Sequence, residues 1–162
     1  MIKPLVYHPD PTLRQPCTEV PPRDAYWELW QDLWDTCRYH RGLGLSAPQI
    51  GKRWRAFMLD GNLCVDPITL RASVSTAFEE EGCLSIPGTT VVVERSTWIR
   101  GQYTGRSGDR ITWKLSGLKA RIWAHELDHL EGRTILDYLL PVKGDEGGQN
   151  NADQEREDQQ LG

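Results

Sequence analysis

The sequence predicts an α+β fold in which small antiparallel sheets wrap around one central helix, with one further helix near the N-terminus. Three observations favour this class. Residues 116–132 place apolar side chains at helical spacing around two histidines, and residues 24–40 carry a second, broader apolar stripe. Between these segments, residues 54–115 hold short runs of alternating apolar and polar residues separated by turns, as is typical of antiparallel strands.

Length and composition indicate a single soluble domain. The chain has 162 residues, of which 38% are hydrophobic and 26% charged. Its net charge of −4 comes from the acids that follow position 142, so the rest is balanced and gives no sign of direct nucleic-acid binding. We expect a folded domain over residues 1–141 and an acidic, disordered tail over residues 142–162. No run suits a secretory signal or a membrane span, which predicts a cytoplasmic protein without membrane contact.

The first 40 residues divide into an arm and a helix. Prolines punctuate residues 1–23, which favours an extended arm wrapped over the domain. Asp24 is a suitable N-cap for a helix that runs to about His40. Its apolar stripe is expected to cover a sheet. The stripe consists of Tyr26, Trp27, Trp30, Leu33, Trp34 and Cys37.

Short strands are expected along the middle of the chain. Strand patterns occupy residues 54–60, 63–70, 91–94, 97–103 and 110–115, and residues 105–109 form the turn between the last two. Residues 42–49 combine two glycines with leucines and a proline, which suits a turn whose backbone lets another group approach closely. The three glutamates at 79–81 precede a Gly-Cys pair and are expected in a solvated loop.

The segment from Ser116 to Gly132 is the helix around which the domain is organised. Ser116 is a good N-cap, and Gly132 is suited to end the helix. His125 and His129 are four residues apart, so their imidazoles stand on one face and can bind the same divalent cation. Glu126 follows the first histidine and could act as a base on water held by that cation.

Two histidines leave such a metal site incomplete. A metzincin protease would place a third histidine where this chain has Ile135. Glu131 is too close to the second histidine to fold back, so the third ligand must come from an upstream segment. The cysteines have no Cys-x-x-Cys spacing. Cys17, Cys37 and Cys64 are expected to be small buried hydrophobes.

Three stretches resemble, in order, the signature motifs of the peptide deformylase family. Gly42-Leu-Gly-Leu-Ser-Ala-Pro-Gln49 is similar to the first motif, and differs from it by a serine in place of an alanine. Glu81-Gly-Cys-Leu-Ser85 is identical to the second, and His125-Glu-Leu-Asp-His129 is the third. The similarity extends from the N-terminal arm to about Pro141. It implies a peptide-deformylase-like catalytic domain over residues 1–141, with the metal-binding helix at its centre.

The resemblance also implies that Cys83 is the missing ligand. In this family the cysteine of the second motif joins the two histidines, so Cys83, His125 and His129 would hold one divalent ion and leave a fourth position for water. Ligand type and geometry alone would indicate zinc. The family characteristically uses Fe²⁺, which is the expected native metal here, with Zn²⁺, Ni²⁺ or Co²⁺ able to occupy the same ligands.

The implied reaction is hydrolysis of the N-formyl group from the initiator methionine of nascent polypeptides, with release of formate. The metal would activate water, and Glu126 would take its proton and pass it to the departing amine. The family pattern assigns the side-chain amide of Gln49 and the backbone N–H of Leu84 to the negative charge that develops on the formyl oxygen.

A substrate groove beside the metal is also implied. The residues expected to bind the substrate are Gly42, Leu43, Gly44, Leu118, Arg121 and Ile122. The glycine-containing stretch would let the peptide lie against the protein as an extra strand, and the leucines and isoleucine would line the methionine pocket. The arginine could close the rim of that pocket, pair with Glu81, or be an ordinary solvated residue.

Two other functions are weighed against the deformylase. Thr90 lies where many family members carry a larger residue, often arginine, so the same metal and base could serve a formamide or amide hydrolase with a non-ribosomal or small-molecule substrate. A catalytically silent binder of nascent chains or ribosomes is disfavoured, because a binder needs no general base. For the deformylase we expect a monomer that binds formylmethionyl peptides and associates at most transiently with the ribosome.

Overall fold

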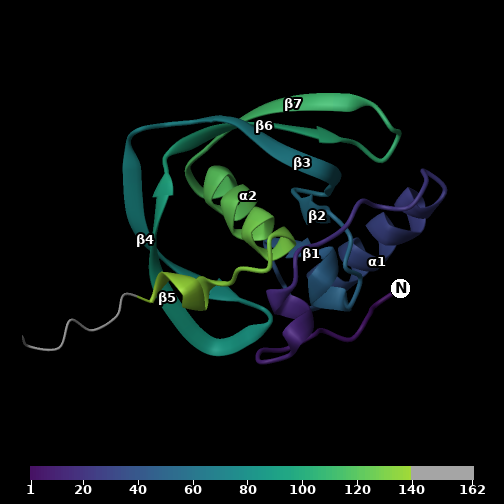
Figure 1. The fold of residues 1–162 in the computed structure, drawn as a ribbon, viewed down its shortest axis with the longest axis horizontal. Coiled ribbons are helices and arrows are strands. Elements are labelled where there is room, and N and C mark those ends of the chain that lie inside the picture. The colour runs from purple at the N-terminus through teal and green to yellow at the C-terminus, as the bar shows by residue number, and fades with distance from the viewer. Residues whose placement is uncertain (140–162) are drawn as a thin grey trace, which may run out of the picture.

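The computed structural model describes residues 1–139, whose elements surround one central helix (Figure 1). The helices are α1 (Ala25–Tyr39) and α2 (Gly117–Leu130), with 3-10 turns at Pro11–Arg14, Ala47–Ile50 and Ile135–Tyr138. The strands are β1 (Gly44–Ser46), β2 (Ala56–Leu59), β3 (Asn62–Ala72), β4 (Thr76–Cys83), β5 (Ile86–Ser96), β6 (Trp98–Thr104) and β7 (Arg110–Ser116). The α+β class predicted from the sequence is confirmed.

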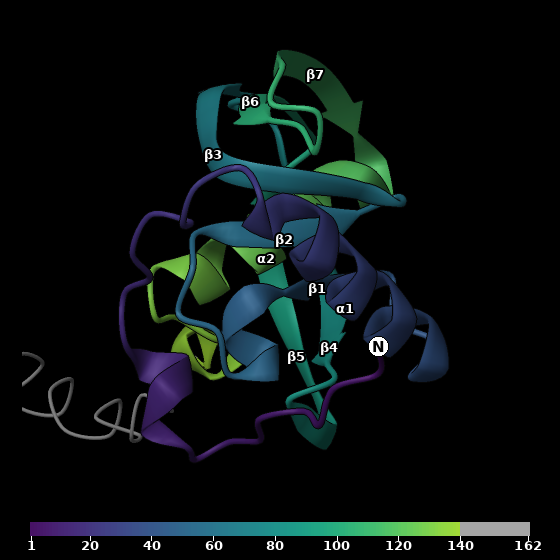
Figure 2. The same ribbon diagram turned by 90° about the vertical axis from the view of Figure 1, so that its right-hand side faces the viewer.

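The strands form two antiparallel sheets that frame α2. One sheet has the order β1-β2-β3-β6-β7, and the other is the two-stranded β4–β5 ribbon. Figure 1 shows α2 between this ribbon on its left and the longer sheet above and to its right. In Figure 2 the helix α1 lies in front of β1 and β2, on the side away from α2. The strands β1 and β2 are therefore covered by a helix on each face.

A buried tryptophan fixes α2 against the longer sheet. Trp123 is fully buried, and its ring meets that of Phe57 edge to face with 5.1 Å between centroids. Its indole N–H donates to the hydroxyl of Thr69 at 3.0 Å. A Cβ at Gly101 would lie 2.5 Å from the same indole, so only glycine fits beneath it. These contacts set the depth of α2 and hence the position of its histidines.

The helix α1 covers β1 and β2 with a narrower face than the sequence indicated. Leu29 and Leu33 are completely buried there. Trp30 and Trp34 stack with 5.9 Å between ring centroids and are only partly buried. Trp27 is 58% exposed, so its expected place on the covering face is wrong. Leucine side chains fill the space against the strands, and the larger indole rings lie along the edge of the contact.

The helix ends differ in part from the expected caps. Neither Asp24 nor Ser116 accepts a hydrogen bond from its helix through the side chain, so both cap predictions are wrong in that respect. Ser116 instead ends β7, and its extended backbone leads directly into α2. The expected stop at Gly132 is confirmed, because its φ of +76° is the left-handed conformation that ends a helix.

The acidic stretch at 79–81 is strand rather than solvated loop. It belongs to β4, where Glu79 pairs with Val93 and Glu81 with Val91 of β5. Glu81 is 6% exposed and Arg95 8%, because both side chains point toward α2. The prediction of a solvated loop, which was based on the polarity of these residues, was wrong because the carboxylate of Glu81 is buried together with its cationic partner. The glycine-containing stretch at 42–49, expected as a turn, includes β1 and continues into the 3-10 turn Ala47–Ile50.

The N-terminal arm is largely extended, as expected, and is tied to the site segments. The N–H of Val6 donates to the carbonyl of Gln49 at 2.8 Å, and that of His8 donates to Ser85 at 2.9 Å. Cys17, Cys37 and Cys64 are buried free thiols, which confirms their expected role. Among the described residues, no helix has the length and apolar character needed to cross a membrane. The expected tail at 142–162 and its boundary lie outside the described residues.

Candidate active site

The three expected metal ligands converge at one point beside α2. His125 and His129 come from one face of α2, and Cys83 comes from the end of β4. Their ligand atoms all lie within 4.8 Å of one another, and Sγ of Cys83 is 3.4 Å from Nε2 of His129. A tetrahedral ion with bonds of about 2.3 Å to sulfur and 2.0–2.1 Å to nitrogen separates such atoms by about 3.5 Å. The donor set therefore fits a divalent metal.

The two imidazoles are held differently. Nδ1 of His125 lies 2.9 Å from Oε1 of Glu81, which leaves Nε2 free to bind a metal. Burial opposes protonation of His125, but hydrogen bonds to Cys83 and Glu81 raise its pKa to about 10. A metal at Nε2 competes with that proton, so metal binding should release it. His129 is fully buried, and burial holds its pKa well below the usual value, which keeps this imidazole neutral.

Glu81 is the centre of a buried ionic cluster behind the histidines. Its carboxylate accepts from Nε and Nη2 of Arg95, both at 3.0 Å, and from Nη1 of Arg121 at 2.8 Å. Burial by itself would raise the pKa of Glu81, but hydrogen bonds from His125 and Arg95 lower it to about 2. Arg95 continues the cluster to Asp128 at 2.7 Å. The cluster joins β4 and β5 to the face of α2 that carries the histidines.

Glu126 is a buried carboxylate directed toward the cavity. It is 3% exposed, and its Oε2 has no hydrogen-bond partner within residues 1–139. Burial raises the pKa of Glu126 to about 7. A Cβ at Gly44 would lie 2.9 Å from its Oε1, so the glycine leaves room for this carboxylate against β1. A carboxyl group with a pKa near neutrality can both accept and return a proton.

The side-chain amide of Gln49 has a fixed orientation. Its Oε1 accepts from both the N–H and the hydroxyl of Ser46 at 2.9 Å. Its Nε2 then faces the ligand cysteine, 3.6 Å from Sγ of Cys83 and 3.2 Å from Oγ of Ser85. The backbone N–H of Leu84 has no acceptor among the described residues. Two N–H donors therefore lie beside the ligand sulfur.

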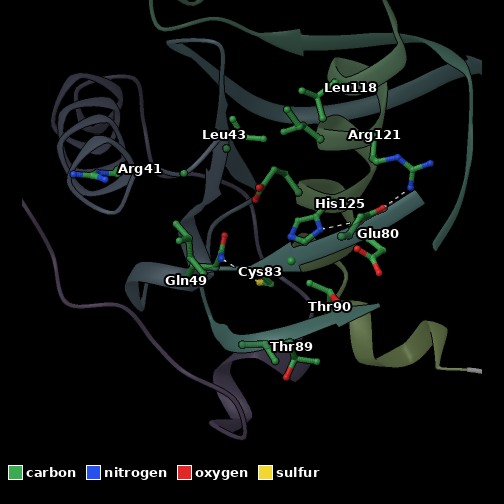
Figure 3. A pocket seen from close by; sticks show the side chains of 18 of the residues that line it. Arg41, Leu43, Gln49, Glu80, Cys83, Thr89, Thr90, Leu118, Arg121 and His125 are labelled. Carbon is green, nitrogen blue, oxygen red and sulfur yellow. Dashed lines mark hydrogen bonds and ion pairs between the residues drawn. The ribbon is translucent and has the colours of Figure 1, made fainter. Parts of the chain in front are cut away.

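A cavity of about 490 Å³ connects these groups (Figure 3). All expected site residues line it except the deeper His129. Figure 3 shows Leu43 and Leu118 on one side of the opening and Thr90 on the other, with Cys83, Gln49 and His125 inside. Of the three roles considered for Arg121, the solvated one is wrong, because its side chain is 7% exposed and it pairs with Glu81.

Sequence reasoning missed several residues that support the site. Ser46 and Ser85 orient Gln49, and Arg95 with Asp128 completes the cluster around Glu81. The two serines lie inside the first and second motifs, so their positions were the available signal. Nothing in the local pattern around Arg95 distinguishes it from a solvated strand arginine. Its partners come from elements fourteen or more residues away in sequence.

An open Cys–His–His site with a buried carboxylate beside it defines the class of protein, a metal-dependent hydrolase. The family model for polypeptide deformylase matches residues 2–144, and the chain belongs to this family. Its members remove the N-formyl group from nascent polypeptides, so the chain is an enzyme of protein biosynthesis.

Individual relatives agree with this assignment. The peptide deformylase of Thermotoga neapolitana is 37% identical over 139 residues, which cover 83% of this chain and 85% of the relative. The crystal structure of the Thermotoga maritima enzyme matches with a TM-score of 0.83 at 33% identity, over 87% of this chain and 99% of that one. The Ehrlichia chaffeensis enzyme in complex with actinonin matches with a TM-score of 0.84 at 29% identity, over 88% and 91%.

Proposed function

We propose that the cavity between β1, β5 and α2 hydrolyses the formyl group of peptides that begin with formylmethionine. One observation carries the proposal: the Cys–His–His donor set, a buried carboxylate and two N–H donors meet at the same cavity. Each of these groups has a task in the hydrolysis of a formamide. The products are formate and a peptide with a free amino group.

Cys83, His125 and His129 would hold the metal ion. When bound there, a divalent ion acts as a Lewis acid that polarises the formyl carbonyl and activates water. We propose Fe²⁺ as the native ion, on the basis of the family resemblance, with Zn²⁺, Ni²⁺ or Co²⁺ able to replace it. The donor set, one thiolate and two imidazoles, is compatible with each of them. Glu81 would orient His125 through its Nδ1.

Glu126 would transfer the proton. Its carboxylate is buried beside the first histidine, and its Oε2, which has no hydrogen-bond partner among the described residues, is available to receive a proton from the attacking water. The same group can then deliver that proton to the departing amine. The negative charge that develops on the formyl oxygen would be stabilised by hydrogen bonds from Nε2 of Gln49 and the N–H of Leu84. Loss of one such donor typically lowers the rate by about 10²–10³.

The peptide would bind as a strand along β1. β1 is an edge strand of the longer sheet, paired with β2 through Gly44 and Leu59. Its other edge faces the cavity, where Gly42, Leu43 and Gly44 can pair with an extended peptide. Leu118 and Ile122 of α2 would contact the methionine side chain. The buried stem of Arg121 would form the far wall, because its charged end is held on β4.

A small formamide is the second candidate substrate. Thr90 is an exposed, uncharged residue at the cavity, and it can make fewer contacts with an extended peptide than a long basic side chain could. We further propose a monomeric, cytoplasmic enzyme that contacts the ribosome at most transiently, with residues 1–141 as the catalytic domain. A chain truncated after Pro141 should retain the activity of the whole chain.

Formate release by anaerobically prepared protein tests the function. We expect hydrolysis of formyl-Met-Ala-Ser, with a clear preference over formyl-Gly-Ala-Ser and over N-methylformamide. Metal analysis of the same sample identifies the ion. Equal rates on the three substrates would reject the peptide deformylase in favour of a general formamide hydrolase. Undiminished turnover by both Glu126→Ala and Glu126→Asp would reject Glu126 as the base.

A further inference from the structure

The outward face of the β4–β5 ribbon continues from the opening of the cavity. Residues alternate along each strand, so one face carries the side chains of buried pairs such as Glu81 and Val91. The opposite face carries the cross-strand pairs Gly82 with Thr90 and Glu80 with Val92. Glu80, Gly82 and Thr90 line the cavity, whereas Val92 lies beyond it and is 55% exposed. A peptide that leaves the cavity on this side passes Glu80.

Glu80 is the carboxylate at the opening that no cation of the described residues neutralises. Glu81 is paired with Arg95 and Arg121, and Glu126 is buried at the bottom of the cavity. Glu80 is exposed and has no ion-pair partner among residues 1–139. Its cross-strand neighbour Val92 and its diagonal neighbour Thr90 carry no charge, and its other diagonal neighbour, Glu94, is also acidic. The charge of Glu80 is therefore available to a ligand.

Arg41, the arginine of the cavity lining without an ion-pair partner among the described residues, lies elsewhere. Arg41 precedes β1 on the other wall, and Figure 3 shows its guanidinium on the side of α1, away from Cys83 and His125. Figure 3 shows Glu80 on β4, on the same side as Thr90. On the β4 side, Glu80 is therefore the lining residue whose negative charge has no ion-pair partner among residues 1–139, and Glu94 beyond the cavity has the same sign.

We propose that Glu80 is a specificity residue that favours formylated peptides with lysine or arginine as their third residue. The inference rests on the proposed function, in which the peptide lies extended along β1. In an extended strand the first and third side chains point to the same side, so the third follows the methionine toward β4. The stem of a lysine or arginine can lie over Val92 while its charge approaches Glu80.

The expected preference is small and depends on salt. An exposed ion pair contributes about 0.2–1 kcal/mol, which corresponds to a ratio of roughly 1.4- to 5-fold in kcat/KM. At about 1 M salt the Debye length falls to about 3 Å, so the ratio should approach one. The preference should appear in KM rather than in kcat, because Glu80 does not contact the reacting atoms.

The test compares amidated formyl-Met-Ala-Lys with formyl-Met-Ala-Glu at low and high salt. The native chain should prefer the lysine peptide by about 1.4- to 5-fold, Glu80→Gln should lose the preference, and Glu80→Lys should reverse it. Glu94→Gln is the matched control, because Glu94 is exposed on the same face of β5 but does not line the cavity. It should keep the native ratio.

Several outcomes would overturn the inference. A native ratio of one, an unchanged ratio in Glu80→Gln, or an equal loss in Glu94→Gln would each reject a local role for Glu80. A preference that appears with lysine in the second position but not the third would reject the proposed orientation of the peptide. In all these cases formyl-Met-Ala-Ser is still hydrolysed, so the proposed function stands. No turnover on any formyl peptide would reject both.

Discussion

Replacement of Glu81 by glutamine should destabilise the protein far more than its surface-like sequence context indicates. The carboxylate is 5% exposed and accepts hydrogen bonds from Arg95, Arg121 and His125. A pKa lowered from 4.5 to about 2 corresponds to about 3 kcal/mol of stability. Removal of one partner of a buried ion pair typically costs about 3–5 kcal/mol, in agreement. We therefore expect Glu81→Gln to lose about 3–5 kcal/mol.

The dependence on pH has a defined sign. Because the folded-state pKa of Glu81 lies below its unfolded value, its contribution is complete above pH 4.5 and is lost as the pH falls toward about 2. The native chain and Glu81→Gln should therefore differ in stability at pH 7 and converge in acid. Affinity for the metal should also fall by about 10- to 100-fold, because His125 loses the acceptor at Nδ1.

Urea unfolding of chelator-treated protein measures the stability, and competition with a chromogenic chelator measures the affinity. Glu79→Gln is the matched control, because Glu79 also pairs with Arg121 but is 60% exposed. It should cost less than about 1 kcal/mol. Equal losses in Glu79→Gln and Glu81→Gln would refute the reasoning from burial. A loss in Glu81→Gln that persists unchanged at pH 3 would refute the assignment to its charge.

Three further predictions follow from the site. Burial raises the pKa of Glu126 from 4.5 to about 7, so the free energy of unfolding of the metal-free protein should fall by up to about 3 kcal/mol as the pH rises between these values. In urea titrations of chelator-treated protein, Glu126→Gln should therefore be more stable than the native chain at pH 8 but not at pH 4. Gly44→Ala would place Cβ 2.8 Å from Ile122 and 2.9 Å from Glu126, so it should lower the stability by about 1–3 kcal/mol and lower kcat. Gly82→Ala is the control: its nearest neighbour is at 4.0 Å, so it should unfold at nearly the native urea concentration. Cys83→Ser should lose its metal during gel filtration and should then no longer release formate, while its circular dichroism spectrum stays native. Retention of one tightly bound ion by this variant would exclude the Cys–His–His site.

Features that depend on neighbouring residues could be predicted from the sequence. His125 and His129 share a face because they are one helical turn apart, and Gly132 ends the helix because it can adopt a positive φ. Alternation over a few residues predicted β2, β3, β5, β6 and β7, but not β1 or β4. Most ends of these elements shifted by one or two residues, which is where local propensity is weakest, whereas β5 begins five residues before the expected start at position 91.

Other features could not be predicted because they depend on residues that are distant in the sequence. The acidic run that contains Glu81 has the composition of a solvated loop, and its burial depends on Arg95 and Arg121, fourteen and forty residues further on. Trp27 has the hydrophobicity of a core residue, but leucines already fill the contact between α1 and the sheet. The orientation of Gln49 depends on two hydroxyl groups from different segments.

The sequence by itself determined the local chemistry of this protein: a helix with two imidazoles and a carboxylate on it, and motifs that resemble those of one family. The tertiary structure alone decided that Sγ of Cys83, forty-six residues before His129, lies 3.4 Å from its Nε2, and that a buried cluster of charges holds the site together. The physical reason is range. Backbone propensity and periodicity act over one or two turns, whereas burial, ion pairing and metal coordination depend on which distant segments the packing of Trp123 and the sheets brings into contact.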